Sequence, residues 1–276
     1  MKCFKSLVAI DFSKDSFIVL QRMLEFTKKS GGIVDVLHIV ENSFFSAKKD
    51  VKYIKEHSLE KLRLTFPDFD EEHFHCIEGD TKEEIAKVAN ILKSELVVIG
   101  KSGETYRFDE IYMGSHTKHI VRSADIPVLV LKKESEIIIK NILLPTDLSI
   151  DSAEVIIKIA KLFPTTHLTL VHFFTVPFET RLNSYGFNDE DTIEYMSVIK
   201  EQSEKNLYKF IQTINIPEGF SISSKVRKSS LNPKLFNKEV EDIPHDILAL
   251  HTTGKVSFYA FDVLESSVEN VLILKV

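Results

Sequence analysis

Short apolar runs alternate with amphipathic segments along the first half of the chain. The runs have the length of strands, and between them apolar residues recur every three or four positions, as on one face of a helix. The predicted strands are 6–11, 34–40, 73–79, 95–100 and 126–132, and the predicted helices are 15–30, 51–66, 81–92 and 115–123. Near-continuous apolar strands that alternate with helices indicate a parallel sheet covered by helices on both faces.

The same order restarts after the charged stretch KKESE (132–136), which is the predicted linker. Asp147 follows an apolar run as Asp11 does in the first half. Further predicted elements are a helix from residue 151, strands 167–174, 219–226, 246–251 and 270–276, and a long helix 191–214. The chain is therefore predicted to be a duplicated α/β domain, with domains 1–136 and 137–276. Each domain is predicted to hold a five-stranded, mostly parallel sheet of order 3-2-1-4-5, with helices on both faces.

Two details of the first half bear on its helices. Gly31 and Gly32 follow the first helical pattern and are predicted to stop that helix. Thr81-Lys-Glu-Glu84 has the form of a capping box, which predicts that Thr81 caps the third helix.

Composition and charge narrow the class of protein. The 276 residues carry a net charge of −6 with acids and bases well mixed, and no basic patch favours nucleic acid as the main partner. No apolar run approaches the roughly 20 residues needed to cross a bilayer, so no membrane partner is expected. Cys3 and Cys76 are too few for a disulfide framework, and the apolar part of the N-terminus is too short for a signal peptide. We therefore expect a cytoplasmic protein.

One loop stands out because glycines punctuate the step from a strand into a helix. The stretch VVIGKSGETYRFDEIYMGSHT (97–117) holds Gly100, Gly103 and Gly114. A glycine loop lets backbone N–H groups approach an anion, and a helix N-terminus adds unpaired N–H groups and partial positive charge. With the strand order above, Asp11 and Gly100 would end the two strands that flank the ligand-binding switch point. An acid opposite an anion cradle suits a nucleotide, although G-x-x-G by itself indicates only a surface loop.

Several stretches of the first half together resemble a known family. They are Asp11 at the end of the first strand, LHIV (37–40), EGDTKEEI (78–85) and IPVLVLK (126–132). With the glycine loop, they make the chain similar to a tandem universal stress protein. Nucleotide-binding members of that family carry G-x2-G-x9-G-[S/T], whereas ten residues separate Gly103 from Gly114 here, one more than the family spacing.

The resemblance covers both halves and implies both a fold and a ligand. It implies two Rossmann-like (adenine nucleotide alpha hydrolase-like) domains that pair through their last strands as a pseudo-dimer, and it leaves a homodimer of whole chains open. It also implies that the first domain binds ATP, ADP or AMP, with or without Mg²⁺. Asp11 would lie near the base and ribose, and the backbone of Ile39 near the adenine. The phosphates and ribose would contact Gly100, Gly103, Gly114, Ser115 and the His116 amide, and Ala9 and Ile99 complete the predicted binding residues.

Two features of the first domain depart from the family pattern. Ala9 and Phe12 stand where the family often has Pro and Gly, and a Phe12 side chain turned into the crevice would crowd it. Asp109 and Glu110 place two carboxylates in the loop, where they would repel phosphates unless they point outward or hold Mg²⁺.

The second half contains an apparent copy of the loop. The stretch 251–266 repeats the spacing of the first loop, with Glu265 in place of Gly114. That alignment leaves too few residues before the last strand for the crossover that a parallel sheet needs. Aligned backward from the last strand, 256–267 becomes the final helix and Ser257 takes the position of Gly114. The phosphate loop is then deleted, and we predict that the second domain does not bind a triphosphate.

Several histidines are weaker candidates for function. His73 and His75 share a strand face, and His116 and His119 share a helix face, so either pair could ligate Zn²⁺. Neither pair has cysteine or carboxylate companions at suggestive spacing, and no metal site is assigned.

Other conspicuous residues have simpler structural explanations. His38 and His172 recur at the same place in the repeat and are predicted to be hydrogen-bonded core residues. Ser115 fits a helix cap better than a nucleophile, because no G-x-S-x-G surrounds it. Arg227 and Lys228 could bind an anion, but a solvated surface explains them more simply.

These observations leave three functions in order. The first is a stress-response module whose bound nucleotide changes a surface read by an unknown protein partner. The second is an interaction module with both crevices empty, acting through its surface and dimer interface. The third is an enzyme, a slow ATPase at most, because Asp11 and the loop acids are the only candidates for the base or metal ligands that hydrolysis needs. No catalytic residue is assigned.

Overall fold

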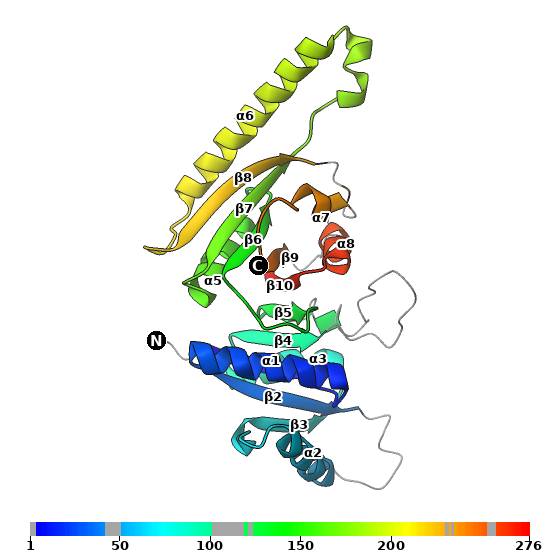
Figure 1. Cartoon of the computed structure of the whole chain (residues 1–276), viewed down its shortest axis with the longest axis vertical. Helices are drawn as coiled ribbons and strands as arrows, with labels where there is room; N and C mark the ends of the chain where they lie inside the picture. Colours follow the sequence, from blue (N-terminus) through cyan, green and yellow to red (C-terminus); the bar gives the residue numbers. More distant parts are fainter. Residues whose placement is uncertain are drawn as a thin grey trace. The chain divides into compact units, whose positions relative to one another are not determined.

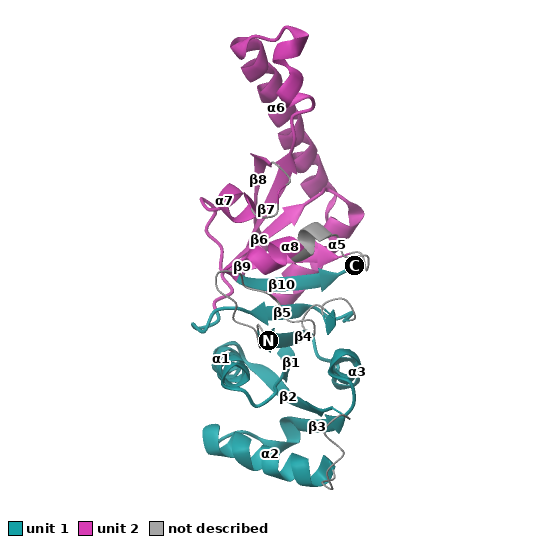
Figure 2. Ribbon diagram, turned by 90° about the vertical axis from the view of Figure 1, so that its right-hand side faces the viewer, with its two compact units in different colours: residues 1–137, 270–275 teal, residues 138–269, 276 magenta. Residues whose placement is uncertain are grey.

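The computed structural model divides the chain into two compact units (Figure 2). Unit 1 comprises Met1–Ile137 and Asn270–Lys275, and unit 2 comprises Ile138–Glu269 and Val276. The structure describes residues 4–41, 51–100, 119–120, 124–229, 232, 235–252 and 258–276, with side chains of the last range only from residue 262 onward. The domain limits predicted from the sequence stay a proposal, and this division differs from them chiefly by giving the last strand to unit 1.

The sheet of unit 1 contains five parallel strands (Figure 1). They are β1 (Phe4–Ala9), β2 (Gly32–Val40), β3 (Phe74–Glu78), β4 (Leu96–Gly100) and β5 (Val128–Leu131). Their order is β3-β2-β1-β4-β5, with β1 paired to β2 on one side and to β4 on the other. The predicted order 3-2-1-4-5 is therefore confirmed for this unit, and the order reverses between β1 and β4.

A sixth strand, β10 (Asn270–Lys275), completes unit 1 by pairing antiparallel with β5. In this pairing Leu272 lies opposite Leu129. The Asn270 side chain accepts the backbone N–H groups of Lys132 at 2.9 Å and Lys133 at 3.1 Å. The two closing strands of the repeat thus pair with each other, as the family resemblance implied.

Helices cover both faces of this sheet. Figure 2 shows α1 (Lys14–Ser30) and α3 (Thr81–Leu92) on opposite faces, with α2 (Val51–Thr65) beside β3. Because both faces are covered, the central strands are apolar throughout: all of β5 and every residue of β4 before Gly100 are buried. Burial of apolar surface stabilises the fold by about 25 cal/mol per Å², so these strands form the core.

The ends of the helices follow from local sequence, with one correction. α1 ends at Gly31, whose φ of 77° is a left-handed conformation that glycine adopts without strain, as predicted. The predicted capping box of α3 is wrong. Its N-cap is Asp80, which accepts the N–H of Lys82 at 2.7 Å, while the Thr81 hydroxyl donates to Glu41 at 2.8 Å. A carboxylate is the better acceptor at the positive end of a helix, which explains why Asp80 takes the cap.

Unit 2 repeats the parallel order with four strands. They are β6 (Asn141–Thr146), β7 (His167–Phe174), β8 (Ser221–Lys228) and β9 (Ile247–Thr252), in the order β8-β7-β6-β9. α5 (Ile150–Leu162) connects β6 to β7 and buries Val155, Ile156 and Ile159. The first four strands of the second repeat therefore keep the order of the first.

The connection from β7 to β8 contains a helix much longer than its counterpart in unit 1. α6 (Asp189–Thr213) is 25 residues long, and its N-terminal part extends away from the strands (Figures 1 and 2). Short 3-10 turns at Glu179–Arg181 and Asn183–Tyr185 precede it. α7 (Phe236–Glu239) and α8 (Phe258–Ser266) flank β9 in the chain. The sequence did not predict α7 or the 3-10 turns, because a single turn is too short to show a helical period.

Candidate functional site

The carboxyl ends of β1 and β4 lie next to each other in the sheet of unit 1. The register pairs Val8 of β1 with Val98 of β4, so the chain leaves the two strands at the same edge of the sheet. Asp11 follows β1 and Gly100 ends β4, as the sequence predicted. The strand order reverses between β1 and β4, so the connections that follow the two strands cross to opposite faces of the sheet. In α/β proteins, ligands bind in the crevice between two such connections.

Asp11 is fixed in a tight turn that leads into α1. Its Oδ1 accepts the N–H of Ser13 at 3.0 Å, and Phe12 between them has a φ of 62°. Ser13 caps α1, because its Oγ accepts the N–H of Ser16 at 3.2 Å. Burial alone would raise the pKa of Asp11, but hydrogen bonds from Ser13 and Ser16 outweigh it and hold the pKa below its usual value. Asp11 is therefore ionised at neutral pH, and the residue is exposed.

The Phe12 ring packs among residues on the β2 side of Asp11. It lies edge-on to Phe17, His38 and Phe74, with ring centroids 5.7, 4.7 and 6.5 Å away. The Lys61 ammonium lies 5.3 Å from its centroid. β4 lies on the other side of β1, so these contacts hold the Phe12 ring away from the end of β4. The position of the ring therefore gives no reason to expect that it crowds the crevice beside Gly100. The same contacts offset the roughly 1–2 kcal/mol that a left-handed residue costs.

His38 and His172 take the same structural role in the two units. Nδ1 of His38 donates to the Ile10 carbonyl at 3.0 Å, and Nδ1 of His172 donates to the Thr146 carbonyl at 3.0 Å. Burial lowers the pKa of His38, although the Ile10 carbonyl and the charge of Asp11 oppose that shift. The prediction that both are hydrogen-bonded structural residues is confirmed.

Gly100 lets β4 end close to α1. A Cβ on Gly100 would lie 3.1 Å from Cγ2 of Val19, tighter than most contacts of real side chains. The other described residues of the predicted site lie at strand ends near this edge: Ala9 ends β1, Ile39 precedes the end of β2, and Ile99 precedes Gly100. Gly103, Gly114, Ser115, His116, Asp109 and Glu110 lie outside the described residues, so their predicted contacts stay predictions.

Unit 2 contains the same turn after its first strand. Oδ1 of Asp147 accepts the N–H of Ser149 at 3.0 Å, and Leu148 between them has a φ of 65°. Ser149 caps α5 by accepting the N–H of Ser152 at 3.1 Å. The repeat is thus preserved down to the hydrogen bonds of a three-residue turn.

The two units differ at the end of the fourth strand. In unit 1, Leu7 of β1 pairs with Val97 of β4, three residues before Gly100. In unit 2, the equivalent Leu143 of β6 pairs with Leu248 of β9, three residues before His251. His251 therefore has the register position of Gly100.

His251 joins a hydrogen-bond chain to the acid of unit 2. The fully buried Ser152 donates its hydroxyl hydrogen to Asp147 Oδ1 at 2.7 Å, and its Oγ lies 3.1 Å from His251 Nε2. Because that hydrogen is committed to Asp147, His251 Nε2 is the donor to Ser152. Burial would raise the pKa of Asp147, but hydrogen bonds from Ser149 and Ser152, with the charge of His251, hold it below its usual value.

The segment between β9 and α8 supports the alignment made backward from the last strand. α8 begins at Phe258, and Glu265 and Ser266 lie in its last turn. Five residues, 253–257, separate the end of β9 from this helix. Because Glu265 lies inside α8, the alignment that placed it at the position of Gly114 is excluded. That the phosphate loop is deleted in the second half stays a prediction.

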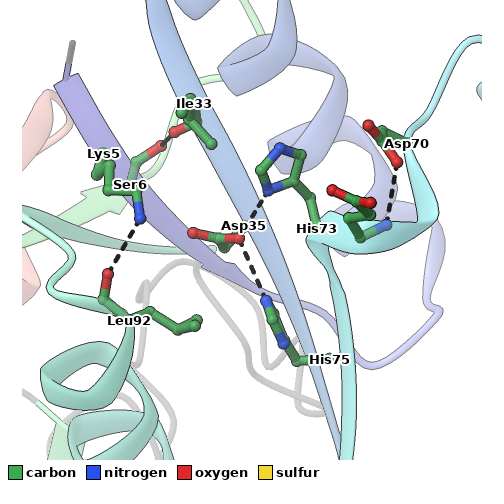
Figure 3. A network of polar contacts seen from close by, with 9 residues as sticks. Lys5, Ser6, Ile33, Asp35, Asp70, His73, His75 and Leu92 are labelled. Atoms are coloured by element: carbon green, nitrogen blue, oxygen red, sulfur yellow. Dashed lines mark hydrogen bonds and ion pairs between the residues drawn. The ribbon is translucent and has the colours of Figure 1, made fainter.

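A buried carboxylate joins His73 and His75 in unit 1 (Figure 3). Asp35 of β2 is 3% exposed, and its Oδ1 lies 3.0 Å from His73 Nδ1 and 3.2 Å from His75 Nε2. The sequence reasoning placed both histidines on one face but missed Asp35, an acid inside an apolar strand, which was the available signal. The described residues contain no group of three or more His, Cys, Asp or Glu that could hold a metal ion. His73 ends the 3-10 helix Glu71–His73 and does not lie in β3, so the predicted shared strand face is wrong. The cluster is a polar network that ties β2 to β3 and to the turn before it.

The basic pair at the end of β8 is paired with acids. Arg227 lies 2.5 Å from Oδ2 of Asp242, and Lys228 contacts Glu179. These partners neutralise both charges, so the anion-binding alternative for this pair loses its support.

Comparison with known proteins shows what the chain is similar to. The sheet of unit 1, of order 3-2-1-4-5 with an acid after β1 and a glycine at the end of β4, has the topology of open α/β sheets, a class in which ligands bind at the switch point. Residues 4–132 match the model of the Universal stress protein family. This segment, which forms most of unit 1, is therefore similar to universal stress proteins. No helix in the described part of the chain is long and apolar enough to cross a membrane.

Individual proteins are similar to part or all of the chain. A universal stress protein of Methanocaldococcus jannaschii is 36% identical over 61 residues, which span 22% of this chain and 35% of that relative. The crystal structure of a universal stress protein from Archaeoglobus fulgidus superposes with a TM-score of 0.64 at 17% identity, covering 100% of this chain and 99% of the other. A functionally unknown protein from Pseudomonas aeruginosa gives 0.65 at 14% identity, covering 99% and 93%. These two likenesses concern the fold, and they extend over both units.

Proposed function

We propose that the crevice between the ends of β1 and β4 in unit 1 binds an adenine nucleotide, and that the protein is a regulatory module of the stress response. The observation that carries this proposal is the pair at the switch point: an exposed, ionised Asp11 next to a strand that ends in Gly100. The match of residues 4–132 to the Universal stress protein family supports it.

Each predicted binding residue has a distinct role in this proposal. The Asp11 carboxylate accepts hydrogen bonds from the ribose hydroxyls or the amino group of the base, and the backbone of Ile39 contacts the adenine. Ala9 and Ile99 border the crevice beside them. The backbone N–H groups of the stretch that follows Gly100 contact the phosphates, with Gly103, Gly114, Ser115 and His116 as the binding residues. ATP, ADP and AMP all fit this chemistry, and Mg²⁺ would offset the charges of Asp109 and Glu110.

Unit 2 keeps the acid but not the rest of the arrangement. His251 stands in the register position of Gly100 and is joined through Ser152 to Asp147. Seventeen residues, 253–269, separate β9 from β10, whereas 27 residues, 101–127, separate β4 from β5. We therefore propose that unit 2 binds no nucleotide triphosphate and that each chain holds one site.

The proposed action is regulation rather than turnover. A nucleotide that binds one arrangement of its loop more tightly than another shifts the population of the two, and a protein partner can read the difference. No positioned base accompanies Asp11 among the described residues, so any ATPase activity is weak. The protein would act in the cytoplasm, where its two cysteines stay reduced.

Mass spectrometry of the purified, denatured protein tests the proposal directly, because a nucleotide that copurifies is released on unfolding. The proposal predicts ATP, ADP or AMP in that sample, or heat on titration with ATP and Mg²⁺ in a calorimeter. Gly114→Glu should abolish both signals by placing bulk and charge among the phosphates. Ser257→Glu, at the position that the backward alignment matches to Gly114, should leave them unchanged. No bound nucleotide and no heat at millimolar ATP would overturn the proposal.

A further inference from the structure

One edge of the strands of unit 2 is formed by β8, which pairs with β7 alone among the described strands. The N–H of Ser229, directly after β8, donates to the carbonyl of Phe174 in β7 at 3.0 Å. Because the backbone groups of successive strand residues point to opposite sides, the odd-numbered residues of β8 face β7 and the even-numbered residues face away from it. The residues that face away are Ile222, Ser224, Val226 and Lys228.

The backbone of these four residues forms an open edge. In the part of the chain that the structure describes, their N–H groups have no hydrogen-bond partner. The carbonyl of Val226 accepts only a long contact, 3.4 Å, from the guanidinium of its neighbour Arg227. An edge strand of this kind presents backbone donors and acceptors at every second residue, which is the period that another extended chain can match.

A groove of about 400 Å³ lies beside this edge. Its strand side is formed by residues 224–227 of β8, and its helix side by Lys200, Glu204, Leu207 and Tyr208 of α6. Figures 1 and 2 both show much of α6 beyond β8, on the side away from β7. A groove between an open strand edge and a helix suits an extended segment. Its main chain can pair with the strand while every second side chain faces the helix.

Positive charge exceeds negative charge beside the edge. Lys225 and Arg227 share one carboxylate oxygen, Oδ2 of Asp242, at 3.9 and 2.5 Å, and neither pairs with a second acid among the described residues. On the helix side, Lys200 is balanced by Glu204 at 3.7 Å. One of the two positive charges on β8 therefore stays unbalanced, and an acidic side chain on an added strand would pair with it.

We propose that the open edge of β8 is a docking site for an extended, acidic segment of another protein, which adds to the sheet as a further strand. Its backbone would pair with Ser224 and Val226, an apolar side chain would pack on Tyr208, and an acid would pair with Lys225. A second copy of this chain is the poorer occupant, because joining two β8 edges would bring one basic strand against another. The inference does not depend on nucleotide binding.

Binding of a synthetic peptide tests this edge. The probe is a fluorescein-labelled peptide of about eight residues, in which valine alternates with threonine and glutamate so that it can form a strand. Fluorescence anisotropy with the full chain should show saturable binding. The same peptide with lysine in place of glutamate should bind about tenfold more weakly, because like charges would then meet beside β8.

Variants at one position separate strand addition from general attraction to the protein. Ser224→Pro removes an N–H that faces away from β7 and fills the edge with the proline ring, so it should weaken binding about tenfold or more. Ser224→Ala is the matched control, because it keeps that N–H, and it should leave binding unchanged. Circular dichroism checks that each variant is folded.

A second pair of variants tests the charge. Lys225→Glu should reverse the preference between the acidic and the basic peptide. Lys209→Glu changes the net charge equally at an exposed position of α6 outside the groove, and it should leave the preference as it is.

Two results would overturn the proposal. One is an acidic peptide that does not bind at millimolar concentration, or that binds Ser224→Pro as tightly as Ser224→Ala. The other is a sedimentation experiment in which the wild-type chain is a dimer and Ser224→Pro makes it a monomer, since the edge of β8 would then belong to a second copy.

Discussion

Asp11 and Asp147 occupy the same turn in the two units, yet their neighbours across the sheet differ. Both carboxylates accept a backbone N–H two residues later at 3.0 Å, and hydrogen bonds hold both pKa values low. Next to Asp11 the adjacent strand ends in Gly100, whereas His251 reaches Asp147 through Ser152. An acid at a strand end therefore carries little information alone. The residue at the end of the neighbouring strand decides whether the carboxylate is available to a ligand.

Gly32 is a residue at which the fold has no room for a side chain. A Cβ on Gly32 would lie 2.8 Å from the backbone oxygen of Phe4 and 3.0 Å from Cγ2 of Thr27. Gly32→Ala should therefore displace the start of β2 and lower the free energy of unfolding by about 1–3 kcal/mol, measured by urea denaturation. Gly100→Ala should cost less, because among the described residues its Cβ would meet a single side-chain methyl, Cγ2 of Val19 at 3.1 Å. A Gly32→Ala protein as stable as the wild type would contradict this account of β2.

His38 should make stability depend on pH in a defined direction. Burial lowers its pKa in the folded state, so as pH falls the unfolded chain binds the proton first. Its contribution is complete above the unfolded pKa of about 6.5 and is lost as pH falls from there toward the lowered pKa of the folded state. The free energy of unfolding should drop more between about pH 7.5 and 5.5 in the wild type than in His38→Gln, which keeps a donor for Ile10. Equal drops in the two proteins would contradict the assignment.

At the scale of elements, the first helix of each unit depends on a serine cap. Ser13 accepts the N–H of Ser16 and Ser149 accepts the N–H of Ser152. Ser13→Ala and Ser149→Ala should each lower the free energy of unfolding by about 1 kcal/mol, measured by urea denaturation. The two losses should add in the double variant, because the caps share no partner. Ser197→Ala, an exposed position inside α6, is the control and should lower stability less than either. Caps that make no difference would show that packing alone fixes the starts of α1 and α5.

The strands and longer helices could be predicted because the local sequence of each shows its pattern of apolar residues. Buried parallel strands such as β4 and β5 are continuous apolar runs, and α1 shows a helical period that stops at Gly31. The cap of α3 was mispredicted because Asp80 and Thr81 are adjacent and both residue types cap helices. In the structure the carboxylate of Asp80 takes the cap, and the Thr81 hydroxyl donates to Glu41 instead.

The parts of the site that sequence reasoning missed depend on contacts between distant residues. Ser152 and His251 are 99 positions apart, and neither belongs to a recognisable motif. The repeat offered one signal, since Ser16 and Ser152 each lie five positions after the acid of their unit. Asp35 was likewise hidden inside an apolar strand. A buried acid needs partners, and His73 and His75, two residues apart in the sequence, supply them from the turn before β3 and from β3 itself.

At the scale of the whole molecule, duplication has produced two units with the same local turns and different crevices. The first four strands have the same order in both units. Asp11 and Asp147 each accept the backbone N–H of the residue two positions later. In unit 2, His251 stands at the position of Gly100, 17 residues rather than 27 separate the fourth strand from the fifth, and the long helix α6 precedes β8. We propose that the nucleotide function is confined to unit 1.

Titration calorimetry with ATP and Mg²⁺ on three proteins tests this central claim most directly. The wild type should bind one nucleotide per chain. Asp11→Asn should weaken binding by about tenfold or more, because a carboxylate that accepts hydrogen bonds from the ligand is lost. Asp147→Asn removes the matching acid from the same turn in unit 2 and should leave the affinity unchanged, although both variants lose stability. Two sites per chain, unchanged affinity in Asp11→Asn, or loss of binding in Asp147→Asn would contradict the account.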